Sequence, residues 1–257
     1  MPRIAITRQV STSLEQCALT FLEREPIDVG LAARQHAGYE AALRESGVTV
    51  EHQNELARYP DAVFVEDTAL VLDEIAVITR PGEPTRRGET EHIAPIIARY
   101  RPLATIESPA KLEGGDIVRL GKRLFVGLSS RSSQAGADQL RVIVEPFGYT
   151  VDAIHLEGAL HLKSAVSALD GDTILAHPAW VDTARFGTNR VIAVAPGEPM
   201  GGNVLAIDGT VIVSDAYPRT REQIERAGFV TKAVTVTELH KAEAGVTCMS
   251  LVFKDAG

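Results

Sequence analysis

The chain has 257 residues, of which 45% are hydrophobic and 23% are charged, as in a globular protein with a sizeable core. It carries 26 Lys and Arg against 34 Asp and Glu, and the net charge of −8 argues against nucleic acid as a partner, because that would require a basic surface. No apolar stretch is long enough to span a membrane and none at the amino terminus is typical of a signal peptide, so we expect no membrane partner.

The only cysteines are Cys17 and Cys248, which excludes a disulfide framework and favours a reducing, cytoplasmic location. Neither cysteine has zinc-ligand spacing with a histidine, so the sequence predicts no metal and no cofactor. An acidic chain favours a cationic small molecule as its partner if the carboxylates lie near a cleft.

Four segments have the residue spacing of helices. In the first, Asp28 is a candidate N-cap and Gly47 a stop signal. In the last, Thr220 and Gln223 have the spacing of a capping box, and Gly228 follows the end. The predicted helices cover residues 28–47, about 86–99, about 132–147 and about 220–227.

Between these helices lie pairs of short apolar runs joined by polar turns, three of which contain Asp-Gly or Gly-Lys. Such pairs predict two strands with a tight connection. The four pairs cover residues 62–80, 114–129, 163–178 and 201–216. A fifth pair would combine residues 246–253 near the carboxyl end with residues 2–8 at the amino end.

Polar residues recur at equivalent positions of these pairs, about 40–50 residues apart, as in proteins built from repeated modules. The positions are Asp67, Asp116, Ser164, Asn203 and Cys248. We therefore expect an α/β fold of five modules, closed into a single domain over residues 1–257, because no composition shift marks a boundary. An ordinary α/β chain with accidental strand–turn similarity is the alternative that periodicity alone leaves open.

Cys248 and His161 are the first candidates for chemistry. Cys248 follows a Gly-containing turn and begins an apolar strand, a position from which a nucleophile can face a central cavity. His161 has the same strand-leading position in its own module, which makes it the best general acid/base candidate among seven histidines. For each residue alone, a buried apolar Cys or a structural His is the alternative.

Carboxylates precede the first two strand pairs, where turn residues and solvated strand ends are common roles. They are Asp61, Glu66, Asp67, Glu113 and Asp116. If these carboxylates surround the same cavity opening as Cys248 and His161, they would repel one another unless a cation lay among them. Arg86 and Arg131 could hold a carboxylate by forked hydrogen bonds, although Arg86 with Arg87 could also be a solvated pair. A site with acids at one end and arginines at the other would suit a zwitterion whose cationic group lies far from its carboxylate.

Six motifs carry a family resemblance that runs in order over nearly the whole chain. They are PDAVFVED (60–67), ITRPGEPTRRGETE (78–91), LEGGDI (112–117), LHLKS (160–164), YPRTRE (217–222) and AGVTCMSL (244–251). With them the chain resembles the dimethylarginine dimethylaminohydrolases, guanidino-modifying enzymes. The resemblance implies a five-bladed α/β propeller of pseudo-symmetric ββαβ modules around a central active-site cavity.

The resemblance also implies residue roles. Its catalytic Cys, His and acid map onto Cys248, His161 and Glu113. Its guanidinium-binding acids map onto Glu66 and Asp67. The remaining substrate contacts map onto Asp61 for the α-amino group, Arg86 and Arg131 for the α-carboxylate, Leu19 on a mobile lid, and the backbone near Ala242. The family pattern has Leu and Ile at these last two places, whereas Ala18 or Leu19 and Ala242 stand here.

The implied reaction is hydrolysis of N-omega-methylated arginine to citrulline and dimethylamine or methylamine through an S-alkylthiouronium on Cys248. His161 would protonate the departing amine and then activate water. Rival readings with the same residues are an arginine deiminase that releases ammonia and an amidinotransferase. Rivals from other classes are a catalytically silent methylarginine-binding protein and a metal or redox role for Cys17 with Cys248. A homodimer is implied by the resemblance only.

Overall fold

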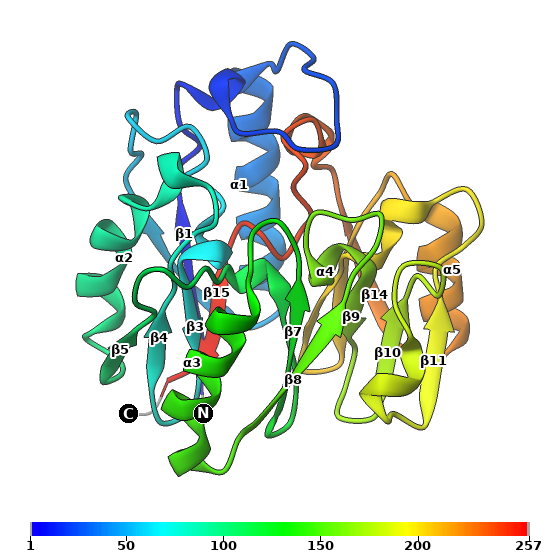
Figure 1. The fold of residues 1–257 in the computed structure, drawn as a ribbon. Helices are drawn as coiled ribbons and strands as arrows, with labels where there is room; N and C mark the ends of the chain where they lie inside the picture. The colour runs from blue at the N-terminus through cyan, green and yellow to red at the C-terminus, as the bar shows by residue number, and fades with distance from the viewer. Residues whose placement is uncertain (1, 256–257) are drawn as a thin grey trace.

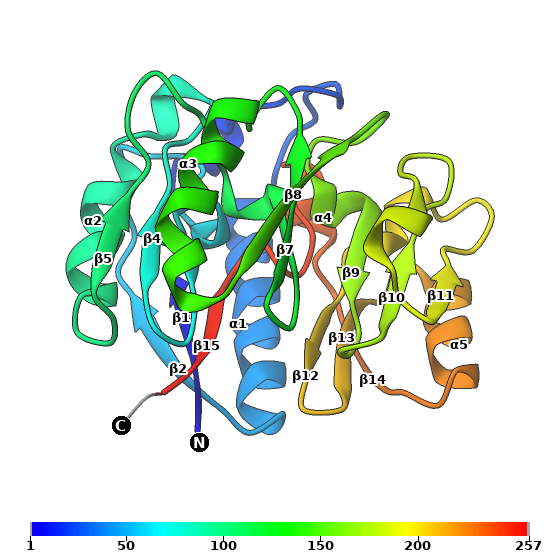
Figure 2. The same cartoon turned by 60° about the horizontal axis from the view of Figure 1, so that its bottom comes forward.

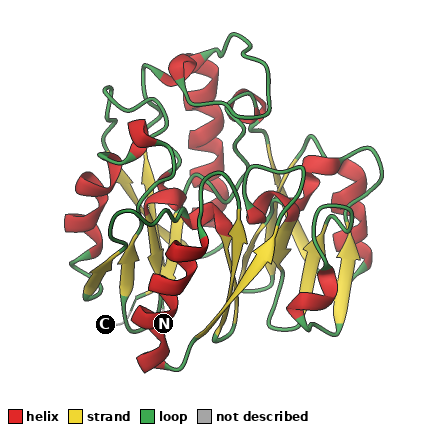
Figure 3. Cartoon of the chain, viewed as in Figure 1, coloured by secondary structure: helices red, strands yellow, loops and turns green. Residues whose placement is uncertain are grey.

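The computed structural model describes residues 2–255, and the strands in this part of the chain form five three-stranded sheets. One cavity is lined by residues of the inner strand of every sheet, so the sheets surround a common axis. Figure 1 and Figure 2 show the sheets spread across the molecule, with β5 and β11 near opposite edges, and Figure 3 shows the helices around them. The predicted five-bladed α/β propeller is confirmed.

Every sheet has the same construction. The inner strand pairs antiparallel with the middle strand, and the middle strand pairs parallel with the outer strand. From inner to outer, the sheets are β15-β1-β2 (Leu251–Lys254, Arg3–Arg8, Val48–Gln53), β3-β4-β5 (Ala69–Val71, Ala76–Ile78, Leu103–Thr105), β6-β7-β8 (Ile117–Leu120, Arg123–Leu128, Thr150–His155), β9-β10-β11 (Val166–Ala168, Thr173–Ala176, Arg190–Ala193) and β12-β13-β14 (Leu205–Ile207, Thr210–Ser214, Val230–Val234).

A parallel pair of strands needs a crossover connection, and helices supply it in four modules. These helices are α1 (Val29–Glu45), α2 (Glu89–Ile97), α3 (Gln134–Val144) and α5 (Pro218–Arg226). In the remaining module the connection between β10 and β11 contains only a 3-10 turn, η6 (Thr183–Phe186). The short helices α4 (Leu162–Ala165) and α6 (Thr237–His240) lie near the end of the common axis at which the inner strands begin.

The predicted helix boundaries are confirmed at α1, where the Asp28 carboxylate accepts the N–H of Leu31 at 2.8 Å. The predicted capping box in α5 is wrong, because Pro218 begins the helix and Thr220 lies inside its first turn. Glu198, which lies before β12 in the chain, accepts the N–H groups of Arg219 and Thr220 instead.

The predicted hairpins are also confirmed. Asp208 and Gly209 join β12 to β13 with φ of 45° and 90°, the left-handed pair that a type I′ turn requires. β15 and β1, from opposite ends of the chain, pair antiparallel from Arg3 opposite Lys254. This pairing completes the fifth module.

A short helical turn precedes each inner strand and carries one of the recurrent polar positions. The turns are η2 (Val65–Thr68), η4 (Gly114–Asp116), α4, η7 (Pro199–Gly202, with Asn203 at its end) and a turn at 246–249. Neighbouring turns contact one another, η2 with η4, η4 with α4, and α4 with η7. The turns therefore gather at one end of the axis, and their polar side chains converge there.

Apolar side chains fill the space between neighbouring modules. One cluster, for example, joins Val77 of β4 to Ile117 of β6 and Leu124 of β7. Burial of such side chains is the main favourable term in holding the modules together. Among residues 2–255, no helix has the length and apolarity needed to cross a membrane.

Two glycine substitutions test the packing of the helical turns. A Cβ at Gly114 would lie 1.9 Å from the carbonyl oxygen of Glu66, whereas one at Gly38, on the exposed face of α1, would meet nothing within 4 Å. We expect Gly114→Ala to destabilise the fold by about 2 kcal/mol or more. Gly38→Ala should stabilise it by about 0.5–1 kcal/mol, since glycine weakens a helix interior. Urea unfolding measures both, and equal stability of the two variants would contradict the close contact between η2 and η4.

Candidate active site

Two cavities lie on opposite sides of the helical turns. The first has a volume of about 20 Å³, and we call it the lid-side cavity because it lies beneath the loop of residues 17–28, the lid. It is lined by Ala18, Asp61, Phe64, Asp67, Arg86, Arg131, Leu160, His161, Ala242, Glu243, Ala244 and Cys248. The second, the central channel, has a volume of about 220 Å³ and runs among the inner strands. Consecutive residues divide between them, because Glu66 and Thr247 line the channel whereas Asp67 and Cys248 line the lid-side cavity. The wall between the cavities is thus very thin.

Cys248 is held at the lid-side cavity by the turn that precedes β15. Its side chain is almost fully buried, and its Sγ accepts the N–H of Gly245 at 3.3 Å. Asn203 fixes this turn by accepting the N–H of Thr247 and donating to its hydroxyl, both at 3.0 Å. Burial raises the pKa of the Cys248 thiol well above its usual value, and the charges of Glu66 and Asp67 raise it further. The thiol is therefore neutral until a cation arrives.

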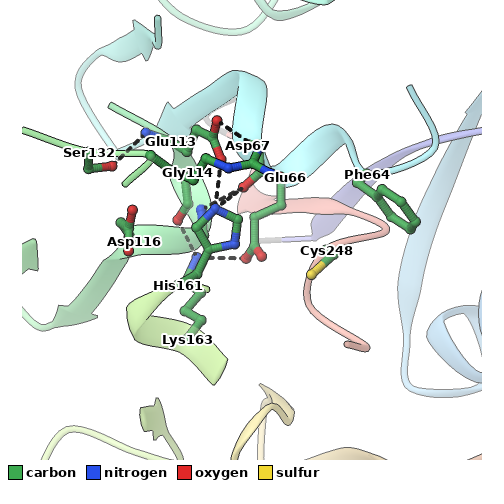
Figure 4. Close-up of polar contacts among 12 residues, drawn as sticks. Phe64, Glu66, Asp67, Glu113, Gly114, Asp116, Ser132, His161, Lys163 and Cys248 are labelled. Carbon is green, nitrogen blue, oxygen red and sulfur yellow. Dashed lines mark hydrogen bonds and ion pairs between the residues drawn. The ribbon is translucent and has the colours of Figure 1, made fainter. Parts of the chain in front are cut away.

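His161 lies directly before α4 and is oriented by two acids (Figure 4). Its Nε2 is 2.6 Å from Glu113 Oε2 and 3.8 Å from Asp67 Oδ1. Burial alone would lower the pKa of His161, but the charge of Asp67 and the hydrogen bond to Glu113 raise it to about 9. Asp116 accepts the N–H of Leu162 at 3.0 Å and so fixes the start of α4. A protonated imidazole at neutral pH can serve as a general acid.

Asp67 joins His161 to the arginine of the site. Its Oδ2 accepts from Arg86 Nη1 at 2.6 Å and its Oδ1 accepts the N–H of Gly115 at 3.0 Å. Burial would raise the pKa of Asp67, but the positive charges of His161 and Arg86 outweigh it and lower the pKa to about 2. Arg86 also contacts both carboxylate oxygens of Glu89 and the carbonyl of Phe64, so little of its guanidinium remains free.

Asp61 and Arg131 have looser partners than Arg86. The Asp61 carboxylate accepts the N–H of Ala18 at 3.2 Å. Arg131 reaches the Thr20 hydroxyl at 3.2 Å and Glu113 Oε1 at 3.5 Å. Ala18 and Thr20 belong to residues 17–28, the loop between η1 (Leu14–Gln16) and α1 that we call the lid. The side chains of Asp61 and Arg131 line the cavity beneath this lid, where they can exchange these partners for a ligand.

Glu66 lies on the other side of the wall. It accepts from Lys163 Nζ and from the Thr247 hydroxyl, both at 2.6 Å, and it lines the central channel. Its backbone N–H donates to the Cys248 carbonyl at 3.1 Å. The structure therefore brings Glu66 next to the Cys248 turn but does not place it among the residues that line the lid-side cavity.

At the lid, Ala18 rather than Leu19 lines the cavity, and Leu19 packs against the core cluster that contains Cys17. Ala242 lines the cavity from the turn after α6. Of the other predicted residues, Asp61, Asp67, Arg86, Arg131, His161 and Cys248 line the same cavity. Glu113 is fully buried behind His161, where it orients the imidazole and touches no open space.

Among the residues that the structure describes, ligand atoms of Asp67, Glu113 and His161 lie within 4.8 Å of one another. Such a cluster attracts a cation. A metal ion would have to displace the proton that the two acids hold on His161, whose pKa they raise to about 9, whereas an organic cation can approach the acids with this proton in place.

Sequence reasoning missed three residues that shape the site. Lys163 neutralises Glu66, and its place in the LHLKS motif was the available signal. Asn203 fixes the Cys248 turn, and its recurrence at the equivalent module position pointed to it. Glu243 lines the cavity and contacts the lid, and the sequence carries no signal for that role.

Comparison with known proteins places the chain among guanidino-modifying enzymes. The arginine deiminase family model matches residues 49–200. A curated N(G),N(G)-dimethylarginine dimethylaminohydrolase of Pseudomonas aeruginosa is 37% identical, over 88% of this chain and 90% of that protein. Its Streptomyces coelicolor counterpart is 34% identical, over 98% and 97%.

A solved structure of the Pseudomonas aeruginosa enzyme, as a cysteine-to-serine variant in complex with citrulline, superposes with a TM-score of 0.93 at 34% identity. The match covers 98% of this chain and 100% of that one. Since both the sequence and the fold correspond over almost the full length of these relatives, the chain belongs to the dimethylarginine dimethylaminohydrolase family.

Proposed function

We propose that this chain hydrolyses N-omega-methylated arginine to citrulline and dimethylamine or methylamine. Its relatives carry the name of that activity and one of them binds citrulline. The observation that carries the proposal is one cavity that presents Cys248, His161 and Asp67 to the same space. A soft nucleophile, a proton donor and an anion are what cleavage of a guanidinium C–N bond requires.

The charges of the cavity suggest how the substrate lies. Asp67 faces the cavity and would hold the guanidinium, with Glu113 and Glu66 adding negative charge from behind the surface. Asp61 would accept the α-ammonium in place of the Ala18 N–H. Arg131, with the remaining N–H of Arg86, would bind the α-carboxylate. Ala242 and the lid near Leu19 would contact the amino-acid end through their backbone.

Substrate binding would activate the nucleophile. Without substrate the Cys248 thiol is neutral, because burial and the charges of Glu66 and Asp67 raise its pKa. The positive guanidinium opposes these charges and so stabilises the thiolate, whose proton passes to solvent as the lid closes. Cys248 is thus nucleophilic mainly when the electrophile is already in place.

The reaction would then proceed in two halves. The Cys248 thiolate adds to the guanidinium carbon, His161 gives its proton to the methylated nitrogen, and the C–N bond breaks to leave an S-alkylthiouronium and the free amine. Water next adds to the same carbon while neutral His161 takes a proton from it. The C–S bond then breaks and the second proton of the water passes to solvent, which releases citrulline and restores the thiolate and the imidazolium. An acid/base group so placed contributes on the order of 10²–10⁴ in rate.

We further propose that residues 1–257 act as one catalytic domain in the cytoplasm, as a monomer or a homodimer. The two free cysteines support a reducing compartment. The five modules, each of which lends one helical turn to the site region, support a single unit.

The substrate assignment predicts the products of a direct assay. The protein is incubated separately with asymmetric dimethylarginine, monomethylarginine, arginine and agmatine, and citrulline, methylamines and ammonia are quantified. We expect kcat/KM for a methylated arginine to exceed that for arginine by about tenfold or more, the scale of a methyl contact. Ammonia from arginine as the main product would favour the arginine deiminase reaction, and the family model that matches here makes that the alternative to test.

The nucleophile assignment predicts unequal effects at the two cysteines. Cys248→Ser should lower kcat by on the order of 10³-fold or more, because an alkoxide does not form under conditions that sustain a thiolate. Cys17→Ala, at the other buried cysteine, should lower kcat far less than Cys248→Ser, because the Cys17 side chain packs in the core and does not line the cavity. Mass spectrometry should detect a substrate adduct on Cys248 during turnover. Full activity of Cys248→Ser, or a silent parent protein, would reject the mechanism.

The acid assignment predicts a pH shift. Glu113→Gln removes the hydrogen-bonded charge that helps raise the pKa of His161 to about 9, so this pKa should fall toward its ordinary value of about 6.5. Because His161 donates only while protonated, activity should be lost at lower pH than in the parent. NMR titration of the His161 ring and the alkaline limb of the kcat profile measure the shift. Glu107→Gln, at an exposed carboxylate outside the site, is the matched control, and an unchanged His161 pKa in Glu113→Gln would refute the pairing.

A further inference from the structure

The lid is fastened by one carboxylate that the proposed reaction does not use. Glu243 Oε1 accepts the backbone N–H groups of Thr20, Phe21 and Leu22 at 3.0, 2.5 and 2.6 Å, and its Oε2 is also 3.0 Å from the Thr20 nitrogen. Glu243 is buried, although the lid tip that it binds exposes the side chains of Phe21 and Leu22. Glu243 therefore accepts all three backbone N–H groups of the tip, and Arg131 adds a contact to the Thr20 hydroxyl.

The backbone at Glu243 supports a dedicated role. Its φ is 59°, in the left-handed region that glycine and asparagine favour and that is uncommon for glutamate. This conformation lies in the turn that follows α6, and the same turn places Ala242, Glu243 and Ala244 at the wall of the lid-side cavity. A strained residue that persists at a functional cavity is a reason to look for a function there.

Neighbouring residues of the same segment hold the rest of the lid. Glu238 accepts the N–H of Asp28 at 2.8 Å, and Lys241 donates to the Pro26 carbonyl at 3.1 Å. These two contacts fix the part of the lid next to α1, whereas Glu243 reaches across to the tip near Arg131. Release of Glu243 would free the tip while the lid stays attached at its base.

The closed lid leaves too little room for a substrate. A volume of about 20 Å³ accommodates roughly one water molecule, far less than an amino acid with a guanidinium head. The Ala18 N–H occupies Asp61 and the Thr20 hydroxyl occupies Arg131, so the lid also covers the charges that would bind the substrate. Admission of any ligand to Cys248 therefore requires the lid to move.

We propose that Glu243 is the latch of the lid: it stabilises the closed position over Cys248 and sets how readily the cavity opens. The three N–H groups of residues 20–22 are its partners in the closed state, and their release exposes Asp61, Arg131 and the thiol. Glu243 is thus a positioning residue that acts through the lid. The effect on turnover rests on the proposed function, whereas lid closure itself does not.

Two measurements without substrate test the latch. Iodoacetamide modification of Cys248, followed by mass spectrometry of its peptide, reports access to the cavity. Trypsin cleavage after Arg24, an exposed lid residue, reports release of the loop. Glu243→Gln removes the negative charge and puts an amide NH2 where Oε2 faces the Thr20 N–H, which leaves a single neutral oxygen for the lid, so we expect both rates to rise about fivefold or more.

Glu198→Gln is the matched control. Glu198 is equally buried and also accepts backbone N–H groups, those of Arg219 and Thr220, but it lies in another module. It should leave both rates at parental values. If Glu243→Gln does not fold, Glu243→Gly removes the same carboxylate, suits the left-handed backbone, and should give the same two increases.

Steady-state kinetics add a third readout. We expect Glu243→Gln to raise KM about tenfold and to change kcat by less than about threefold, because the bound substrate restores lid closure through its own contacts. Parental modification and cleavage rates in the Glu243 variants would overturn the latch, and so would equal increases in Glu198→Gln. A raised KM with unchanged lid protection would instead make Glu243 a substrate contact. A protein that turns over no methylarginine but shows the two increases would reject the proposed function and retain the latch.

Discussion

The site depends on an excess of negative charge that is buried around one thiol. Carboxylates from two segments, residues 60–67 and 112–117, gather at the end of the axis. They are Asp61, Glu66, Asp67, Glu113 and Asp116, and all are nearly excluded from solvent. Isolated buried anions would be prohibitive, so four of them have a cation or several donors as partners, whereas Asp61, within residues 2–255, accepts only the Ala18 N–H. Arg86, His161 and Lys163 supply the cations. Burial, together with the charges of Glu66 and Asp67, raises the pKa of the Cys248 thiol and keeps it neutral, and these charges make a cationic substrate the natural partner of the cavity.

The modular fold supplies the partners that stabilise these buried carboxylates. Each module begins its inner strand with a helical turn, and the turns pack so closely that a glycine is needed where Gly114 meets the Glu66 carbonyl. Backbone N–H groups at these turns then satisfy the acids, as Gly115 does for Asp67 and Leu162 for Asp116. Residues far apart in sequence thus share one rigid frame, and catalytic groups on such a frame need little reorganisation during reaction.

Much of this could be predicted from the sequence because the modules repeat. Hairpin signals such as Asp208-Gly209 and the recurrent polar positions predicted the fold and pointed to Cys248, whereas His161 lies before Ser164, the equivalent position of its module, at the start of α4. Which cavity a side chain faces could not be predicted, since Glu66 and Asp67 are adjacent and a short 3-10 turn sends them to opposite sides of the wall. The left-handed Glu243 was equally hidden, because the sequence signals for such backbone are glycine and asparagine.

The small volume of the lid-side cavity determines when water can reach the thiouronium carbon during hydrolysis. Without ligand, the space beside Cys248 holds about one water, so a substrate admitted by movement of the lid would leave little room for additional water. Water can then reach the thiouronium carbon only where the departing amine has left room. His161 loses its proton in the same step that creates this room, so the base and the space for its water arise together. The closed geometry thereby favours release of the amine before hydrolysis over premature attack by water.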